Sequence, residues 1–195
     1  MQTKLIIVRH GITDWSVEKR YCGRTDIPLN NSGKKQAAEL CRVLSSEKID
    51  AVYTSSAKRA HEFAKIAFEK LPIAVMPELN EMAFGIFEGL TYDEIMRKHH
   101  EIYTKWIEDP SGEDIPEGES MGDFKKRIES AFKKIIRHGE NKTSAVITHA
   151  GTIKMIISNI LAIEDIWKTK LEWGCIAAIV AKNEKEGKWV RSPLF

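Results

Sequence analysis

An arginine and a histidine stand side by side near the start of the chain, where Arg9-His10 follows the apolar run Leu5–Val8. Such a run is typical of a buried strand, and open α/β sheets bind ligands at the carboxyl ends of their strands. The planar donors of Arg suit an oxyanion such as phosphate, and neutral His is a nucleophile near physiological pH. The pair indicates phosphoryl transfer through a phosphohistidine, although a strand-end histidine is also often only structural.

Two later segments repeat this pattern. In the first, a β-favouring run leads into a helix, with Ser56 as the expected N-cap and Arg59 in the first turn, where anions bind. In the second, an apolar run ends at His149, before small residues that open a helix. Because the carboxyl ends of parallel strands meet at one edge, we expect Arg9, His10, Arg59 and His149 to lie around one phosphate.

A phosphatase also needs a group that gives a proton to the departing alkoxide. Glu81 and Glu88 are candidates, because both stand among apolar residues, and an apolar environment favours the protonated form of a carboxyl group. The pattern alone does not choose between them.

These residues, in this order, resemble the histidine phosphatase superfamily, also called the phosphoglycerate mutase-like family. The resemblance covers nearly the whole chain and includes Arg9-His10-Gly11, Thr13-Asp14-Trp15, Gly23-Arg24, Asp26, Pro28-Leu29, Gly33, Gln36-Ala37, Ser55, Arg59-Ala60, Glu81, Phe84-Gly85, Glu88-Gly89, Pro116–Ser120 and His149-Ala150-Gly151. It implies an α/β fold, a three-layer αβα sandwich with a mostly parallel central sheet.

The resemblance also implies roles. His10 is the residue that is phosphorylated, Glu81 matches the proton donor, and Glu88 matches a glutamate with a structural role. The residues expected to surround the phosphate or contact the substrate are Arg9, Gly11, Ser16, Arg59, His149 and Ala150. Ser16 stands where the family usually has Asn, and Phe63 stands where it often has Thr, so one phosphate contact differs.

Composition agrees with a single enzyme domain spanning residues 1–195, with a lid-like insertion at about residues 91–119. A net charge of +2 argues against nucleic acid as a partner, and no apolar stretch is long enough to cross a membrane. We expect a small phosphate ester as partner, no metal and no cofactor, and we leave a homo-oligomer open. The absence of a signal-peptide pattern and three scattered cysteines favour the cytoplasm.

The hydrophobic pattern predicts alternating strands and helices with an insertion in the middle. Thr91 and Glu94 form a capping box that starts a helix in the insertion. Beyond the strands already named and one at 73–76, we expect helices at 32–46, 57–70, 120–138 and 152–163, and a strand at 175–181 that pairs with 188–191.

Other phosphatase and hydrolase chemistries fit less well. No cysteine is followed six positions later by the Arg of a cysteine phosphatase. Gly118–Gly122 matches the nucleophile elbow of serine hydrolases, but that elbow must follow a buried strand, and here the preceding residues are polar and include a proline. We therefore expect Ser120 to cap a helix.

Two alternatives to a phosphatase remain: a phosphoglycerate mutase on the same site, and a phosphate-binding regulatory module with little turnover. The insertion is acidic, which should repel a substrate carboxylate and so favours the phosphatase; its acidic residues are Glu101, Glu108, Asp109, Glu113, Asp114, Glu117 and Glu119. The chain is most similar to the small phosphatases of the family, such as α-ribazole phosphatase. Trp15, Met82, Phe84 and Trp106 either line the pocket or belong to the core.

Overall fold

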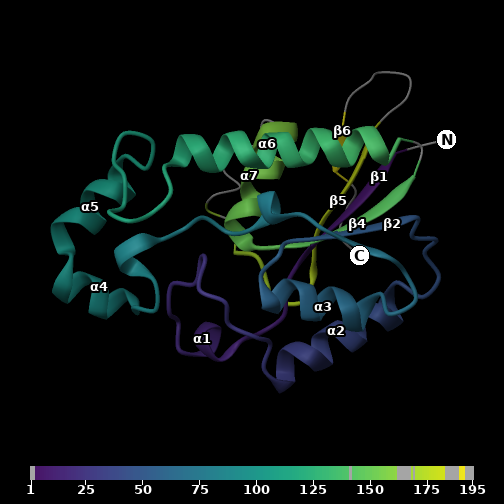
Figure 1. Ribbon diagram of the computed structural model, residues 1–195, viewed down its shortest axis with the longest axis horizontal. Helices are drawn as coiled ribbons and strands as arrows, with labels where there is room; N and C mark the ends of the chain where they lie inside the picture. Colours follow the sequence, from purple (N-terminus) through teal and green to yellow (C-terminus); the bar gives the residue numbers. More distant parts are fainter. Residues whose placement is uncertain (1–2, 141, 162–167, 169, 183–188, 192–195) are drawn as a thin grey trace.

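A computed structural model gives the fold of residues 3–140, 142–161, 168, 170–182 and 189–191 (Figure 1). Its centre is a six-stranded sheet in the order β3-β2-β4-β1-β5-β6. The strands are β1 (Lys4–Arg9), β2 (Ala51–Thr54), β3 (Ile73–Val75), β4 (Thr143–Thr148), β5 (Ile176–Lys182) and β6 (Trp189–Arg191). The first four are parallel to one another, while β5 runs antiparallel to β1 and pairs with β6, which confirms the expected mostly parallel sheet.

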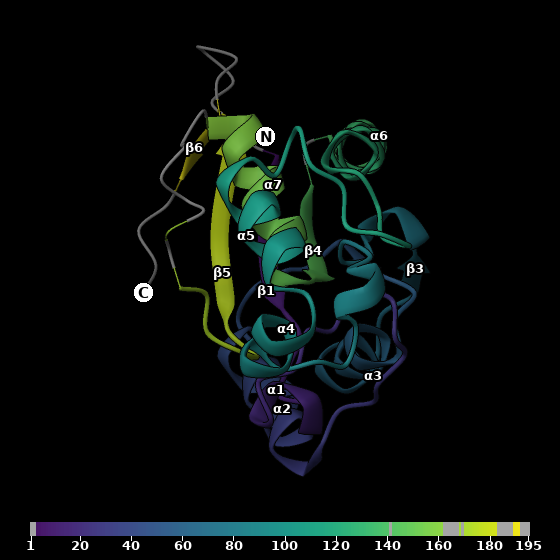
Figure 2. The ribbon, with the colours of Figure 1, turned by 90° about the vertical axis from the view of Figure 1, so that its left-hand side faces the viewer.

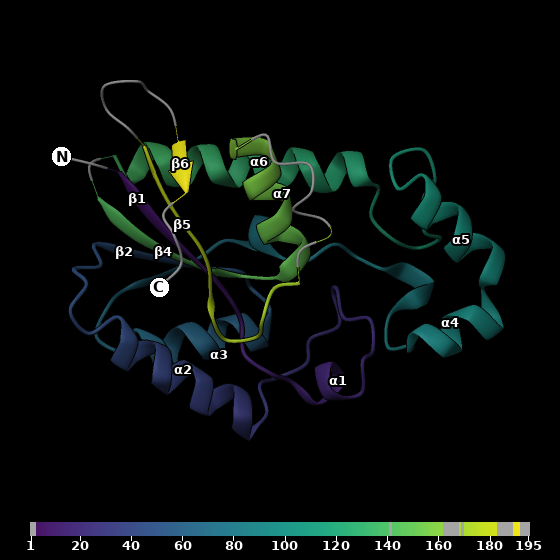
Figure 3. The ribbon, with the colours of Figure 1, turned by 180° about the vertical axis from the view of Figure 1, so that it is seen from behind.

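Helices cover both faces of this sheet, which confirms the three-layer sandwich (Figures 1 and 3). One face carries α2 (Asn31–Val43) and α3 (Lys58–Ala67), and the other carries α6 (Met121–His138) and α7 (Ala150–Leu161). The two faces have separate apolar cores. Side chains of β1 point alternately to the two cores: Leu5 and Ile7 pack with α6 and α7, and Ile6 and Val8 pack with α2 and α3.

Several helix ends differ from the sequence expectation. Helix α2 begins at Asn31, one residue earlier than expected, because the side chain of Asn30 accepts the backbone N–H of Gly33. Ser56 is not the N-cap of α3; that position is Ala57, whose N–H donates to Asn80 Oδ1 at 3.3 Å. Helix α7 begins at Ala150, two residues earlier than expected, and the predicted end at 163 lies outside the described residues.

The segment between β3 and α6 projects beyond the strand ends together with α1, as the views in Figures 1 and 2 show. Its elements are η1 (Pro77–Leu79), η2 (Gly85–Phe87), α4 (Tyr92–Lys98) and α5 (His100–Glu108); α1 is Asp14–Val17. The capping box of Thr91 and Glu94 is present at the start of α4. Aromatic side chains of this segment join the core under α6, with Trp106 buried beside Phe87.

No helix within the described ranges is long and apolar enough to cross a membrane.

Candidate active site

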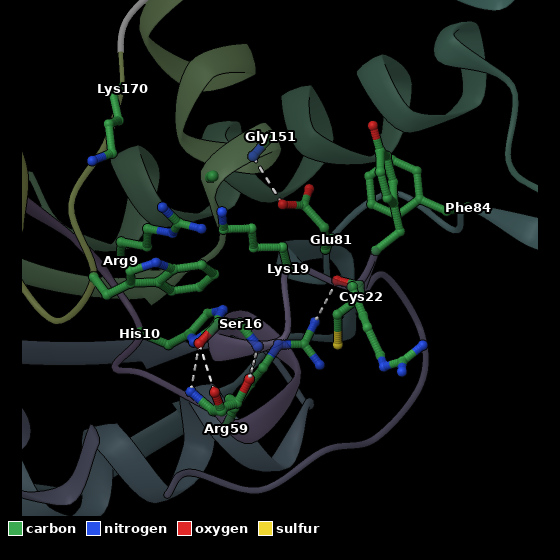
Figure 4. A pocket seen from close by; sticks show the side chains of 15 residues that line it. Arg9, His10, Ser16, Lys19, Cys22, Arg59, Glu81, Phe84, Gly151 and Lys170 are labelled. Carbon is green, nitrogen blue, oxygen red and sulfur yellow. Dashed lines mark hydrogen bonds between the residues drawn. The ribbon is translucent and has the colours of Figure 1, made fainter. Parts of the chain in front are cut away.

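The three strands β2, β4 and β1 lie side by side, and the residues after them meet at one edge of the sheet. Arg9 pairs in register with Thr148, and Thr54 with Ile147, so the strands end at the same level. A pocket of about 540 Å³ opens at this edge (Figure 4). Its lining residues are Arg9, His10, Thr13, Ser16, Lys19, Arg20, Tyr21, Cys22, Arg59, Glu81, Phe84, Ala150, Gly151, Lys170 and Trp173.

His10 is held as a neutral ring with one nitrogen available. Its Nδ1 lies 2.8 Å from the carbonyl oxygen of Gly11, so Nδ1 carries the proton and Nε2 keeps its lone pair. Burial, followed by the charges of Arg59 and Arg9, lowers the pKa of His10 well below its ordinary value. The ring is therefore uncharged at neutral pH, with the lone pair of Nε2 available for nucleophilic attack.

Gly11 contributes through its backbone and does not line the pocket. A Cβ at this position would lie 2.7 Å from the carbonyl oxygen of Gly33, closer than such atoms approach. The absence of a side chain lets the loop after β1 pack against α2, and this packing sets the carbonyl that orients His10.

His149 lies beside His10, with their ring centroids 5.0 Å apart. Its Nε2 is 2.7 Å from the hydroxyl of Ser55, and its Nδ1 is buried without a hydrogen-bond partner among the described residues. Burial and the charge of Arg59 lower the pKa of His149 well below its ordinary value. If Ser55 donates to Nε2, the neutral ring presents Nδ1–H as an unpaired donor beside His10.

Two guanidinium groups supply positive charge. Arg59, in the first turn of α3, is 1% exposed and donates to the carbonyl oxygens of Thr25 at 3.0 Å and Gly23 at 2.8 Å. Arg9 donates to the carbonyl oxygen of Leu171, and its guanidinium carbon lies 3.1 Å from the centroid of the Trp173 ring. Burial lowers the pKa of Arg9 to about 10, so it remains charged at neutral pH.

Glu81 lines the pocket, and backbone donors hold its carboxylate. Its side chain accepts the N–H of Met82 at 3.0 Å and that of Gly151, in the first turn of α7, at 2.9 Å (Figure 4). The residue is 7% exposed. Glu81 and His10 thus line the same pocket, and the carboxyl group of Glu81 is held in place by the backbone.

Glu88 has a different environment. It accepts hydrogen bonds from five donor groups: the N–H groups of Gly23, Arg24, Thr25 and Phe84 and the hydroxyl of Thr25. These bonds fix the loop whose carbonyl oxygens receive Arg59. Glu88 is not among the pocket-lining residues, which supports a structural role and separates the two carboxylates that the sequence pattern left open.

Ser16 and Ala150 both line the pocket. The hydroxyl of Ser16 donates to the carbonyl oxygen of Thr13 at 2.7 Å and accepts the N–H of the same residue, as part of a capping box at α1. Because a hydroxyl has one proton, Ser16 already uses its donor within the chain. Ala150 contributes the first residue of α7.

Several pocket residues were not predicted from the sequence. The clearest is Trp173, whose ring lies 5.2 Å from that of His10. Its loop reaches the site because the N–H of Gly174, at φ +68°, donates to the carbonyl oxygen of His10. The glycine after Trp173 is the one sequence signal that could have indicated this turn. Lys19, Arg20, Tyr21, Cys22 and Lys170 also line the pocket.

The sequence left open whether four apolar residues line the pocket or belong to the core, and the structure places each of them. Phe84 lines the pocket, whereas Met82 and Trp106 are buried in the core. Trp15 is not a lining residue; it packs against Gly89, where a Cβ would lie 3.0 Å from its ring.

Two further expectations are decided by the structure. Ser120 accepts the N–H of Asp123 at 3.0 Å and is the N-cap of α6, so the serine-hydrolase elbow is excluded. The acidic residues of the insertion do not line the pocket, and Glu119 is paired with Arg127. These residues therefore do not contact a ligand in the pocket, and their expected repulsion of a substrate carboxylate stays a prediction.

Comparison with known proteins gives a consistent result. The sequence model of the histidine phosphatase superfamily (branch 1) matches residues 5–191. Phosphoserine phosphatase 1 of Hydrogenobacter thermophilus is 30% identical over 163 residues, which is 83% of this chain and 77% of that protein. Adenosylcobalamin/alpha-ribazole phosphatase of Escherichia coli is 28% identical over 180 residues, covering 90% of this chain and 89% of that protein.

A solved structure agrees with these matches. The alpha-ribazole phosphatase from Shigella flexneri superimposes with a TM-score of 0.85 at 27% identity, covering 98% of this chain and 95% of that one. The chain thus belongs to branch 1 of the histidine phosphatase superfamily and is a phosphatase of that family.

Proposed function

We propose that this phosphatase is a metal-independent phosphomonoesterase that acts on a small phosphorylated metabolite through a phosphohistidine at Nε2 of His10. The observation that carries the proposal is the hydrogen bond from Nδ1 of His10 to the carbonyl oxygen of Gly11, in a ring kept neutral by burial and by two neighbouring arginines. This arrangement directs the lone pair of Nε2 away from the backbone and leaves it free to attack phosphorus.

In the first step, the Nε2 lone pair forms a bond to phosphorus while the phosphorus–oxygen bond of the ester breaks. Glu81, as the carboxylic acid, gives its proton to the departing alkoxide oxygen. Arg9 and Arg59 neutralise the phosphoryl oxygens, and Nδ1–H of His149 donates to one of them. The two guanidinium groups supply the charge that a metal ion would otherwise supply.

In the second step, the Glu81 carboxylate takes a proton from a water molecule, and the water oxygen forms a bond to phosphorus. The bond between Nε2 and phosphorus breaks, which returns the electron pair to His10 and releases inorganic phosphate. Glu81 is then protonated again, so the cycle is closed.

Two leaving groups follow from the names of the relatives. The relative from Escherichia coli supports α-ribazole 5'-phosphate, which is also the substrate expected from the sequence. The relative from Hydrogenobacter thermophilus supports phosphoserine. The first leaving group is neutral and aromatic, and the second carries a carboxylate, so the two need different residues in the pocket wall to bind them.

The proposal is tested by labelling and by mutation. Turnover of a ³²P-labelled ester should give an acid-labile, base-stable phosphoprotein, and His10→Ala should lose both the label and turnover. His100→Gln removes an exposed imidazole and should keep both. Wild-type turnover in His10→Ala would overturn the proposal. Complete loss of activity with a chelator, restored by one added metal, would overturn its metal independence.

A further inference from the structure

The pocket wall carries more positive charge than one phosphate requires. Besides Arg9 and Arg59, the lining includes three cations, Lys19, Arg20 and Lys170, against the single carboxylate of Glu81. A phosphate monoester is a dianion near neutral pH, and two arginines already match it. The other cations are therefore available to other parts of the ligand, unless the protein itself neutralises them.

Two of the three are paired within the chain. Arg20 donates to Glu18 and Glu94 and also to the carbonyl oxygen of Gly89 at 2.6 Å. Lys170 forms an ion pair with Glu172 at 3.1 Å. Lys19 pairs with no carboxylate in the described part of the chain, and its side chain extends into the pocket, with the amino group on the side of Arg9 (Figure 4).

The backbone of Lys19 adds a second observation. Its φ is +57°, in the left-handed region that is costly for a residue with a Cβ and easier for Gly or Asn. The turn is fixed on both sides, because Lys19 follows Glu18, the C-cap of α1, and the N–H of Arg20 donates to the carbonyl oxygen of Trp15 at 2.9 Å. A lysine is thus kept at a backbone position where Gly or Asn would be more stable, and such strained positions cluster at functional sites.

We propose that Lys19 binds a carboxylate on the leaving group, so that the substrate class is a phosphomonoester with a second, singly charged anion on its alcohol part. One ammonium matches one carboxylate in charge, whereas a second phosphate dianion would need a further cation, and Arg20 and Lys170 are already paired. This inference rests on the proposed function and selects among its substrates: it favours carboxylated esters over α-ribazole 5'-phosphate.

The test uses two esters that differ mainly in the carboxylate, 3-phosphoglycerate and glycerol 3-phosphate. The quantity measured is the ratio of their kcat/KM values for phosphate release. In Lys19→Asn, which keeps a residue suited to the left-handed backbone, this ratio should fall about fivefold, as expected for one exposed charge pair. Lys19→Gly should give the same fall. The matched control Lys35→Asn removes an exposed lysine on α2 and should leave the ratio unchanged.

Salt gives an independent measurement on the same proteins. Raising the ionic strength should lower the wild-type ratio and should change the ratio of Lys19→Asn much less, because the lysine contribution is screened. Unchanged ratios in both Lys19 variants, with both esters still hydrolysed, would overturn this inference and leave the proposed function intact. If the wild-type protein hydrolyses neither these esters nor any other phosphomonoester, the proposed function is overturned, and with it the inference about Lys19.

Discussion

At the scale of single residues, two glutamates show how the environment assigns a role. Glu81 lines the pocket and contacts the first turn of α7, whereas Glu88 accepts hydrogen bonds from the loop that begins at Gly23. Alkyl phosphates have poor leaving groups that need a proton as the bond breaks, and aryl phosphates need it far less. The ratio of activities on these two ester types therefore reports the proton donor.

Glu81→Gln removes the transferable proton while it preserves the shape of the side chain. We expect hydrolysis of an alkyl ester such as glycerol 3-phosphate to slow by about 10²- to 10⁴-fold, and hydrolysis of p-nitrophenyl phosphate to slow much less. Steady-state kcat/KM values for the two esters provide the measurement.

Glu88→Gln is the comparison for this prediction. It replaces a charged acceptor of five donor groups, so we expect the free energy of unfolding to fall by about 1.5–3 kcal/mol, with similar effects on both esters. Selective loss of the alkyl ester in Glu88→Gln, with equal losses on both esters in Glu81→Gln, would exchange the two roles.

Three site residues were visible in the sequence because they stand at strand ends: Arg9 is the last residue of β1, and His10 and His149 directly follow β1 and β4. Arg9-His10 and His149 carry that signal in the few residues around them. Trp173 and Lys19 carry no comparable signal. Trp173 reaches the site through contacts with residues far away in the chain, including a hydrogen bond from the Gln36 amide to its carbonyl oxygen at 3.0 Å. Lys19 becomes notable only through its backbone angle and its place in the pocket.

At the scale of elements, α6 holds the segment that carries Glu81. The guanidinium of Arg127 on α6 donates to the carbonyl oxygens of Glu78 at 2.8 Å, Asn80 at 2.6 Å and Glu81 at 2.9 Å, and it also pairs with Glu119. Arg127 thus joins the helix to the chain that leads to Glu81, the proposed proton donor, and we expect it to position that residue. Sequence analysis did not identify it.

Arg127→Met should remove these bonds, although the carbonyl oxygen of Asn80 would keep the hydroxyl of Thr152 as a donor, and Glu119 would keep the N–H of Ala83. We expect the free energy of unfolding to fall by about 1.5–3 kcal/mol, as for the loss of hydrogen bonds to a charged group. Because Glu81 loses its support, kcat on alkyl esters should fall more than kcat on p-nitrophenyl phosphate. Urea unfolding measures the change in stability, and assays with an alkyl ester and with p-nitrophenyl phosphate measure the change in kcat.

Lys126→Met serves as the matched control, since Lys126 lies on the same helix with an 81% exposed side chain. It should change the free energy of unfolding by less than about 1 kcal/mol and should not change the ratio of the two activities. A ratio in Arg127→Met equal to that of the wild type would show that Arg127 stabilises the fold without positioning Glu81.

Helix starts show which elements a sequence can specify. Thr91 and Ser120 cap their helices through bonds to residues three positions on, so their signal is local and both predictions were confirmed. The cap predicted at Ser56 was wrong because α3 is capped from elsewhere in the chain: Asp26 Oδ1 accepts the N–H of Lys58 at 2.7 Å, and Asn80 accepts the N–H before it. Such distant partners leave no periodic pattern.

At the scale of the whole molecule, the sheet brings two neutral imidazoles and two guanidinium groups into one buried site. Burial and the arginine charges lower the pKa values of His10 and His149 in the folded protein. In the unfolded chain both rings return to an ordinary pKa of about 6.5. Below that pH the unfolded state binds more protons than the folded state, so stability is complete above about pH 6.5 and declines as the pH falls.

The decline is measurable by urea unfolding at pH 7.5 and pH 5.5. Each histidine that stays neutral in the folded protein should cost about 1.4 kcal/mol of the free energy of unfolding at pH 5.5. His10→Ala and His149→Ala should each remove about half of the drop shared by these two rings, whatever their effect on stability at pH 7.5. His100→Gln, which removes an exposed imidazole, should keep the wild-type drop.

An equal drop in all four proteins would mean that both buried rings take up protons as readily in the folded state as in the unfolded chain. Since attack on phosphorus requires a neutral His10, that result would also place the acid limit of activity near pH 6.5 instead of well below it.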